Sequence, residues 1–288
     1  MDTTELLKKV RTIELKTRSL TDQMFSGDYQ SAFKGQGMSF SEVRSYQYGD
    51  DVRNIDWNVT ARTGYPHIKV FEEERELTVM LVIDISPSTF TGMHQSRHEL
   101  LAELAAVLAF SAIKNNDKVG LLLFSDQVEA FLPPGKGKKH ILRIIRDILA
   151  RRGQSQQTNI HTALEYLNNI LHKRSIVFLL SDFISSPFDT ALQLTGRRHD
   201  LIGVHPRNQI ERELPAGGLY QFRNAESGQI QSYDLGYKPH RKAWLQHFSD
   251  HEEGLQSLFR KNSCDLLSFF MQDSYIPLLH QFFNRRVQ

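Results

Sequence analysis

A carboxylate and two hydroxyls follow directly after a run of apolar residues in the first third of the chain. The run covers residues 77–83 (LTVMLVI), and Asp84, Ser86 and Ser88 come next in the pattern Asp-x-Ser-x-Ser. Oxygen ligands of this kind suit a small divalent cation such as Mg²⁺, which takes few carboxylates from a protein and keeps positions open for water. The first chemistry that the sequence suggests is therefore the binding of a divalent metal ion.

Two further oxygen-bearing residues, Thr158 and Asp182, stand where they could join this set. Thr158 comes just before a predicted helix, and Asp182 follows directly after the apolar run 175–180 and Ser181. A carboxylate at the end of a buried strand costs free energy unless a cation or hydrogen-bond donors meet it. Two such carboxylates close together would repel each other, and a divalent ion would remove that conflict. The alternative is that Asp84 only caps a helix or closes a turn.

Apolar segments at regular intervals predict the elements that would position these residues. Strands are expected at 77–83, 118–124, 128–132, 175–180 and 200–204, with a turn at 133–135 and helices at 95–114, 138–150, 160–172 and 188–197. Strands that alternate with helices of this length predict a Rossmann-like α/β fold, a mainly parallel sheet with helices on both faces. Such sheets bind ligands beyond the carboxyl ends of their strands, where the oxygen-bearing residues would lie.

The regions on either side of this alternation have other patterns. An amphipathic helix is expected at 5–24, followed by loops and short strands, one of them at 68–71. Beyond Pro206, the pattern predicts a hairpin at 219–233 and helices at 240–260 and 264–285. The predicted organisation is an N-terminal helix with an irregular or β segment at 1–75, the α/β domain with the metal site at 76–206, and a hairpin with C-terminal helices packing on the core at 207–288.

Composition narrows the possible functions. The chain has 288 residues and a formal net charge of +2, so it has no electrostatic drive toward nucleic acid or an acidic membrane. Cys264 is the only cysteine, which excludes intramolecular disulfides and cysteine-based zinc sites and fits a reducing compartment. The N-terminus lacks the apolar core of a signal peptide, and no apolar stretch approaches the roughly 20 residues of a membrane helix. We expect a cytoplasmic protein with no membrane span and no nucleic-acid partner.

Other motifs carry less weight. His94 and His98 are spaced i, i+4, as two metal ligands on one helix face would be, but without a third ligand a surface location is favoured. Ser181 lacks the Gly-x-Ser-x-Gly context of a hydrolase nucleophile. Several apolar residues in the expected helix at 240–260 fit one helix face, for which core packing is favoured over a partner groove; they are Trp244, Phe248, Leu255, Leu258 and Phe259.

The five oxygen-bearing residues resemble the metal-ion-dependent adhesion site of von Willebrand factor type A domains. A longer stretch upstream is more specific and comprises the segments FKGQGMSF at 33–40, EVR at 42–44, YGDDVRNIDW at 48–57, TAR at 60–62 and FEEER at 71–75. Together these motifs resemble the bacterial "domain of unknown function 58" family, whose members carry such an A-like domain. The resemblance covers nearly the whole chain, from about residue 20 to the C-terminal helices.

The resemblance implies roles for the site residues. Asp84, Ser86, Ser88 and Thr158 would contact the ion directly or through water, and Asp182 would act mostly through water. One coordination position stays open in such sites, so that a Glu or Asp of a partner can bind there and the ion, Mg²⁺ or Mn²⁺, can bridge a protein contact. In the family the gene commonly neighbours a MoxR-type AAA+ ATPase, which implies a role with that ATPase in chaperone-like maturation of client proteins.

Three classes of function stay open. A non-enzymatic binding module is favoured, because the sequence shows no general base or nucleophile. A Mg²⁺-dependent hydrolase or phosphoryl-transfer enzyme is the alternative, although such enzymes usually gather more acids than Asp84 and Asp182. A structural scaffold would leave the loop without metal. The segment Gly49–Arg62 is either a second interaction surface or, as we favour, an ion-pair network that packs Trp57 and the N-terminal segment onto the core.

Overall fold

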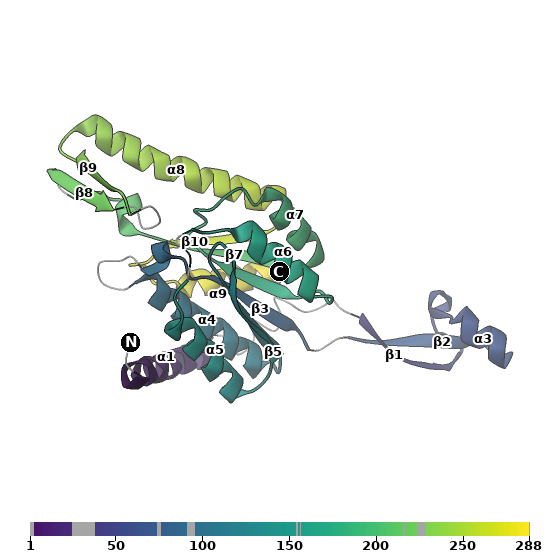
Figure 1. The fold of residues 1–288 in the computed structure, drawn as a ribbon. Helices are drawn as coiled ribbons and strands as arrows, with labels where there is room; N and C mark the ends of the chain where they lie inside the picture. The colour runs from purple at the N-terminus through teal and green to yellow at the C-terminus, as the bar shows by residue number, and fades with distance from the viewer. Residues whose placement is uncertain are drawn as a thin grey trace. The chain divides into compact units, whose positions relative to one another are not determined.

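The computed structural model describes residues 3–24, 38–73, 76–90, 96–153, 155, 157–215, 217–223 and 228–287. The chain divides into two compact units, one formed by residues 33–77 and the other by the remainder. The larger unit contains a six-stranded sheet with the strand order β10-β7-β6-β3-β4-β5 (Figure 1). Of the predicted features, residues 33–37 of the motif at 33–40, residues 74–75 of the motif at 71–75, the histidine at 94 and the hairpin turn at 224–227 lie outside the described residues.

The sheet of the larger unit is mainly parallel, as the sequence predicts. Its strands are β3 (Thr78–Asp84), β4 (Lys118–Phe124), β5 (Val128–Gly135), β6 (Ile176–Leu180), β7 (Asp200–Arg207) and β10 (Asp265–Phe270). Neighbouring strands run parallel except for β4 and β5, which are antiparallel. The central strands β3 and β6 are buried along nearly their whole length, which is why their sequences are continuously apolar rather than alternating.

Helices cover both faces of this sheet, which confirms the predicted fold class (Figure 1). On one face α1 (Thr3–Met24), α4 (Arg97–Lys114) and α5 (Lys138–Ala150) pack together. The other face carries α6 (Ile160–Ile170) and α7 (Asp189–Arg198), and the C-terminal half of α8 (Lys238–Lys261) joins the same hydrophobic cluster. A Cβ on Gly203 of β7 would lie 2.6 Å from the ring of Phe259, so the close approach of α8 requires glycine there.

The chain order around β3 creates the position where a ligand is expected. From β3 the chain crosses to β4 on one side, and β6 lies on the other side of β3. Such a switch in strand order leaves a crevice at the carboxyl ends of the two strands. Ile83 of β3 is paired with Leu180 of β6, so Asp84 and Asp182 follow neighbouring strands at the same edge.

Two predictions about the edges of the sheet are wrong. The predicted helix at 264–285 is instead the strand β10, followed by α9 (Ile276–Val287). The short apolar run of β10 fits a helix or a strand equally well, and its pairing with β7 decides the outcome. The predicted turn at 133–135 belongs to β5, whose two prolines are accommodated because β5 is an edge strand.

The hairpin predicted beyond Pro206 is confirmed, and it consists of β8 (Leu219–Arg223) and β9 (Ile230–Asp234). The 3₁₀ turn η3 (Gln209–Glu211) precedes it. In the part of the chain that the structure describes, no helix combines the length and the apolar character needed to cross a membrane.

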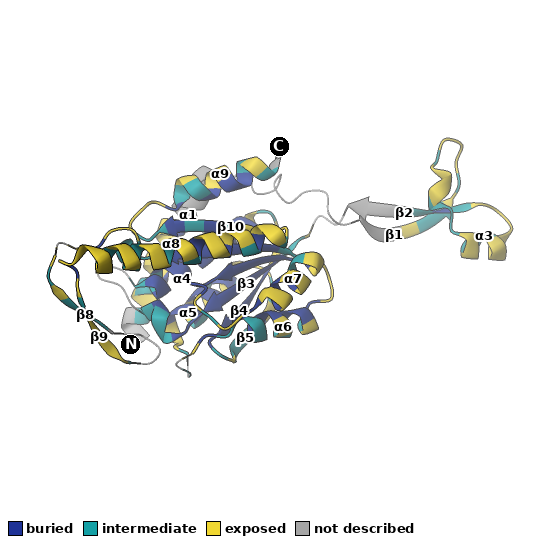
Figure 2. Ribbon diagram, turned by 90° about the horizontal axis from the view of Figure 1, so that it is seen from above, coloured by how far each residue is buried: buried dark blue, intermediate teal, exposed yellow. Residues whose placement is uncertain are grey.

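The smaller unit is an antiparallel pair, β1 (Met38–Ser45) and β2 (His67–Glu73), with η1 (Val52–Asn54) and α3 (Trp57–Thr63) between the two strands. Two acids of the expected ion-pair network, Asp50 and Asp56, form ion pairs, but their partners are Arg44 at 2.8 Å and Lys69 at 3.7 Å, which lie outside the predicted segment. Ile68 is the only side chain among those described in this unit that is buried, and Trp57 is 70% exposed. Figure 2 shows α3 and the chain around it mainly in the colours of exposed and intermediate residues. The packing of Trp57 onto the core stays a prediction.

Candidate functional site

Asp84 ends strand β3 and is fully buried. Its Oδ1 accepts a hydrogen bond from the backbone N–H of Ser86 at 2.8 Å, and its Oδ2 accepts one from the hydroxyl of Ser181 at 2.7 Å. The first bond closes a turn of the type that aspartate favours. Asp84 therefore closes a turn, which is one of the two structural roles that the sequence suggests. The other role, capping the next α-helix, belongs to Ser96, which is the N-cap of α4.

The hydroxyls of the loop lie side by side. The Oγ atoms of Ser86 and Ser88 are 3.1 Å apart, and Ser86 is completely buried. Thr89 fixes the loop by donating both its backbone N–H and its hydroxyl to the carbonyl of Ser86, at 3.1 and 2.7 Å. The Asp-x-Ser-x-Ser segment thus places one carboxylate and two hydroxyls in a compact, hydrogen-bonded loop.

Thr158 lies on an adjoining loop and is 4% exposed. This loop is attached to the end of β3, because Gly153 donates its N–H to the carbonyl of Ile85 at 2.9 Å. A Cβ on Gly153 would be only 2.7 Å from that carbonyl oxygen, so the contact requires glycine. The carbonyl of Thr158 accepts a hydrogen bond from the hydroxyl of Ser185 at 3.2 Å. That the Thr158 hydroxyl completes a ligand set stays a prediction.

Asp182 is 2% exposed and already has a cationic partner. Its Oδ2 accepts a hydrogen bond from Nη1 of Arg97 at 2.6 Å, and its Oδ1 accepts one from the N–H of Ile184 at 3.1 Å. Arg97 is itself 6% exposed, donates to the carbonyl of Pro206 at 3.1 Å, and lies 3.7 Å from Glu211. Arg97 is not among the residues predicted from the sequence. The only local signal for it is a cation in the first turn of a helix, where the helix dipole disfavours positive charge.

Among the described residues, the buried Asp84 carboxyl has hydrogen-bond donors but no cationic partner. Burial, and next the charge of Asp182, raise the pKa of Asp84 to about 7, while the N–H of Ser86 and the hydroxyl of Ser181 oppose this rise. Arg97 compensates Asp182, whereas in the described part of the chain Asp84 is bonded to neutral donors alone. A buried carboxylate of this kind is stabilised when a cation binds beside it.

The donor set fits a small, hard divalent ion. Hydroxyl and carboxylate oxygens are the ligands that Mg²⁺ and Mn²⁺ take in proteins. Among the described residues, no three His, Cys, Asp or Glu side chains cluster closely enough to hold a metal ion. The set at the end of β3 differs from such clusters because most of its oxygens come from hydroxyls.

The prediction that His98 lies on the surface is wrong. His98 is 4% exposed within the buried helix α4, and burial lowers its pKa to about 4.

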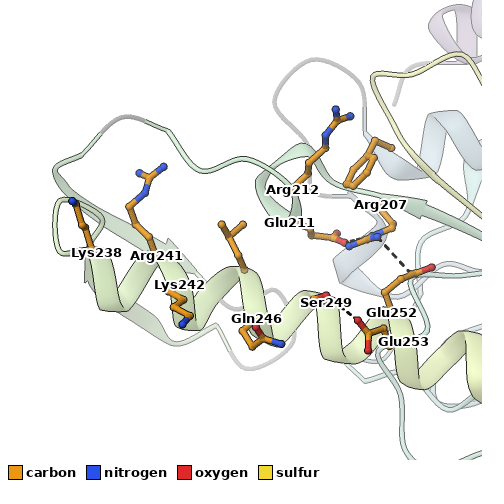
Figure 3. A pocket seen from close by; sticks show the side chains of 12 residues that line it. Arg207, Glu211, Arg212, Lys238, Arg241, Lys242, Gln246, Ser249, Glu252 and Glu253 are labelled. Atoms are coloured by element: carbon orange, nitrogen blue, oxygen red, sulfur yellow. Dashed lines mark hydrogen bonds and ion pairs between the residues drawn. The ribbon is translucent and has the colours of Figure 1, made fainter.

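Several cavities border the described residues near this end of the sheet. One of about 640 Å³ is bordered by Ser88, Arg97 and Asp182 and therefore opens onto the candidate site. A larger one of about 800 Å³ includes none of the five predicted residues (Figure 3). Its central cations are already engaged, since Arg207 donates to Glu211 at 3.1 Å and Arg241 donates to the carbonyl of Pro215 at 2.7 Å. The smaller cavity is the one connected with the site.

A mainly parallel sheet with an Asp-x-Ser-x-Ser loop at the end of its central strand defines a Rossmann-like α/β protein with oxygen ligands at the carboxyl edge of the sheet. The chain belongs to the family described as "Protein of unknown function DUF58", whose model matches residues 42–254. Family membership confirms the resemblance to this family that the sequence motifs indicate, while the resemblance to a metal-ion-dependent adhesion site stays a prediction.

The individual proteins that resemble this chain share little of its sequence. Uncharacterized proteins of Mycobacterium tuberculosis and Mycobacterium bovis are 28% identical over 240 residues, which cover 82% of this chain and 75% of theirs. An aerotolerance-related membrane protein from Bacteroides fragilis matches with 15% identity and a TM-score of 0.47, over 73% of this chain and 98% of that one. The von Willebrand factor A domain of SpRpn10 matches with 16% identity and a TM-score of 0.40, over 73% and 95%. Likenesses this weak say nothing about ligands or partners.

Proposed function

We propose that this protein is a metal-dependent protein-binding module. Mg²⁺ or Mn²⁺ is held by Asp84, Ser86, Ser88 and Thr158, and the ion bridges to an acidic residue of a partner. The observation that supports this most strongly is the fully buried Asp84, which is bonded to neutral donors beside two adjacent hydroxyls. Asp182 acts through water, because Arg97 already occupies one of its oxygens.

The composition of the set explains why the ion would attract a partner. Among the residues that contact the ion, Asp84 alone brings a negative charge, and the hydroxyls bring none. A divalent ion held in this way keeps net positive charge, and a carboxylate from outside is its natural further ligand. Ser88 and Asp182 border the cavity of about 640 Å³, so the partner would approach from there.

The partner that family membership favours is a MoxR-type AAA+ ATPase, with or without a client protein that offers the acidic residue. In this proposal the module recognises its partner through the bridging ion, and the ATPase supplies the energy for chaperone-like maturation or assembly of the client. The geometry of the site is compatible with either protein as the source of the carboxylate.

Calorimetry and capture experiments test the proposal together. Mg²⁺ should bind the wild-type chain and raise its stability by about 2.7 kcal/mol at a hundredfold excess over the dissociation constant. Asp84→Ala should abolish binding, and undiminished binding would refute the assignment. Ser86→Ala combined with Ser88→Ala should lose partner capture in Mg²⁺ while staying folded. The matched control is Ser249→Ala with Ser257→Ala, two exposed positions on α8 that should capture the partner normally.

The enzymatic alternative has a direct test of its own. The described site offers two carboxylates, and one of them is paired with Arg97. Purified protein should therefore show no phosphatase or nuclease turnover in Mg²⁺. Turnover that disappears in Asp182→Asn would favour a metal-dependent hydrolase or phosphoryl-transfer enzyme instead.

A further inference from the structure

The cavity beside the candidate site has two different walls. Ser88, Arg97 and Asp182 form the polar wall at the carboxyl end of the sheet. Another part of the lining, here called the aromatic wall, comes from the β8–β9 hairpin and the N-terminal half of α8 and consists of Phe222, Tyr233, Trp244 and Phe248. A volume of about 640 Å³ lies within the range of sites that enclose a ligand of several groups.

The aromatic wall is a preformed surface centred on Trp244. The ring of Trp244 lies 4.5 Å from that of Phe222, 5.5 Å from that of Tyr233 and 5.4 Å from that of Phe248, measured between centroids. The indole N–H is already satisfied, because it donates to the carbonyl of Ile210 at 3.1 Å. All four rings are only half-buried, so apolar surface stays available on a scaffold that ligand binding need not reorganise.

Core packing does not account for this wall. The sequence predicts that the apolar face of α8 packs on the core, and its C-terminal half does so, with Leu255 at 5% and Phe259 at 1% exposure. Trp244 and Phe248 continue the same face but line the cavity instead. Half of the apolar face therefore packs inside the protein, and the other half faces the space next to the candidate metal site.

We propose that the aromatic wall binds a large apolar side chain of the same partner segment whose acidic residue binds the ion. The inference rests on the proposed function and adds the chemistry of the partner: a peptide segment with Asp or Glu and, within a few residues, Phe, Leu or Met. Charge and polarity favour this occupant, since one wall offers a cation to a carboxylate and the other offers rings to an apolar group. The side-chain amides of Gln229 and Gln231 also line the cavity, where they can bond the peptide backbone.

Synthetic peptides with blocked ends provide the probe. Each contains one Glu and one Phe separated by zero to three glycines, and matched peptides carry Gln for Glu or Gly for Phe. The 288-residue chain has two tryptophans, Trp244 in the wall and Trp57 in the smaller unit. With ¹⁵N-labelled tryptophan, the indole signal of Trp244 reports on the wall and that of Trp57 is the internal reference.

At the best spacing, the Glu-and-Phe peptide should bind in Mg²⁺ about tenfold more tightly, or better, than its Gly-for-Phe match, as burial of a phenyl ring implies. The indole signal of Trp244 should shift and that of Trp57 should not. Ala243→Phe should remove the advantage, because this exposed residue of α8 lines the cavity and a larger side chain fills it. Ser257→Phe, exposed on the same helix, is the matched control and should keep it.

The outcomes separate this inference from the proposed function. If Glu peptides bind in Mg²⁺ with equal affinity whether or not they carry Phe, and Trp244 does not respond, the inference is overturned and the metal bridge stands. If the Phe peptides bind equally well in EDTA, the wall serves an occupant unrelated to the ion, which also overturns it. If no peptide shows Mg²⁺-dependent binding, the proposed function fails and the inference fails with it.

Discussion

Replacing Asp84 with asparagine should stabilise the metal-free protein and abolish its response to metal. Burial and the nearby Asp182 raise the pKa of Asp84 from an ordinary 3.8 to about 7. A carboxyl group with a raised pKa in the folded state ionises more readily in the unfolded chain, so stability falls as the pH rises through this interval. The loss of folding stability is absent at pH values below the pKa of Asp84 in the unfolded chain, and it is complete at pH values above its pKa in the folded protein.

The size of the effect follows from the shift. A rise of about three units, at about 1.4 kcal/mol per unit, makes ionised Asp84 cost about 4 kcal/mol at about pH 8. At about pH 5 only the part of the interval between the unfolded pKa and that pH contributes, so the loss of stability is about 2 kcal/mol. Asparagine keeps the acceptor for the N–H of Ser86 but alters the bond to Ser181, which offsets about 1 kcal/mol of the gain.

Urea unfolding in EDTA at the two pH values measures this gain. Asp84→Asn should be more stable than wild type, and by more at the higher pH. In Mg²⁺ the wild type should gain stability while the variant gains none. Asp250→Asn, an exposed carboxyl on α8, is the control and should change little at either pH. A variant that is less stable than wild type at the higher pH in EDTA would refute the reasoning, because ionised Asp84 would then be compensated without metal.

Further variants test the packing around the site, again by urea unfolding. Arg97→Met leaves Asp182 as an unpaired buried charge and should cost about 3–5 kcal/mol. Adding Asp182→Asn should restore part of that stability, and no recovery would mean that Arg97 acts through packing alone. Gly203→Ala places a Cβ 2.6 Å from the ring of Phe259 and should cost about 1–3 kcal/mol. Gly254→Ala, with open space around it, should instead stabilise α8 by up to about 1 kcal/mol. Equal effects of the two alanines would contradict the close contact at β7.

The central part of the fold was predictable because its elements carry their own signals. The strands β3 and β6 are buried on both faces, and a continuous apolar run is the direct consequence. For β10 the local signal was ambiguous, since six residues with several apolar side chains fit a strand or part of a helix. Its pairing with the edge of β7, more than sixty positions earlier in the chain, decided the outcome. No local pattern contains that information.

In the candidate site, too, some residues follow from local sequence signals and others depend on contacts between distant parts of the chain. The approach of Asp84 and Asp182 follows from strand order, because the ends of parallel neighbours meet at one edge. Arg97 comes from α4, and its contact with Asp182 depends on how that helix packs on the sheet. The aromatic wall likewise requires the hairpin and α8 to lie together, which spacing along the chain does not specify.

The most direct measurement of the central claim is anomalous diffraction from crystals soaked in Mn²⁺. The proposal predicts one strong peak within ligand distance of the Asp84 carboxylate and the hydroxyls of Ser86 and Ser88, with Thr158 on the same ion and Asp182 one water molecule away. Crystals that show no peak beside Asp84 at saturating Mn²⁺, or a peak only at other residues, would contradict it.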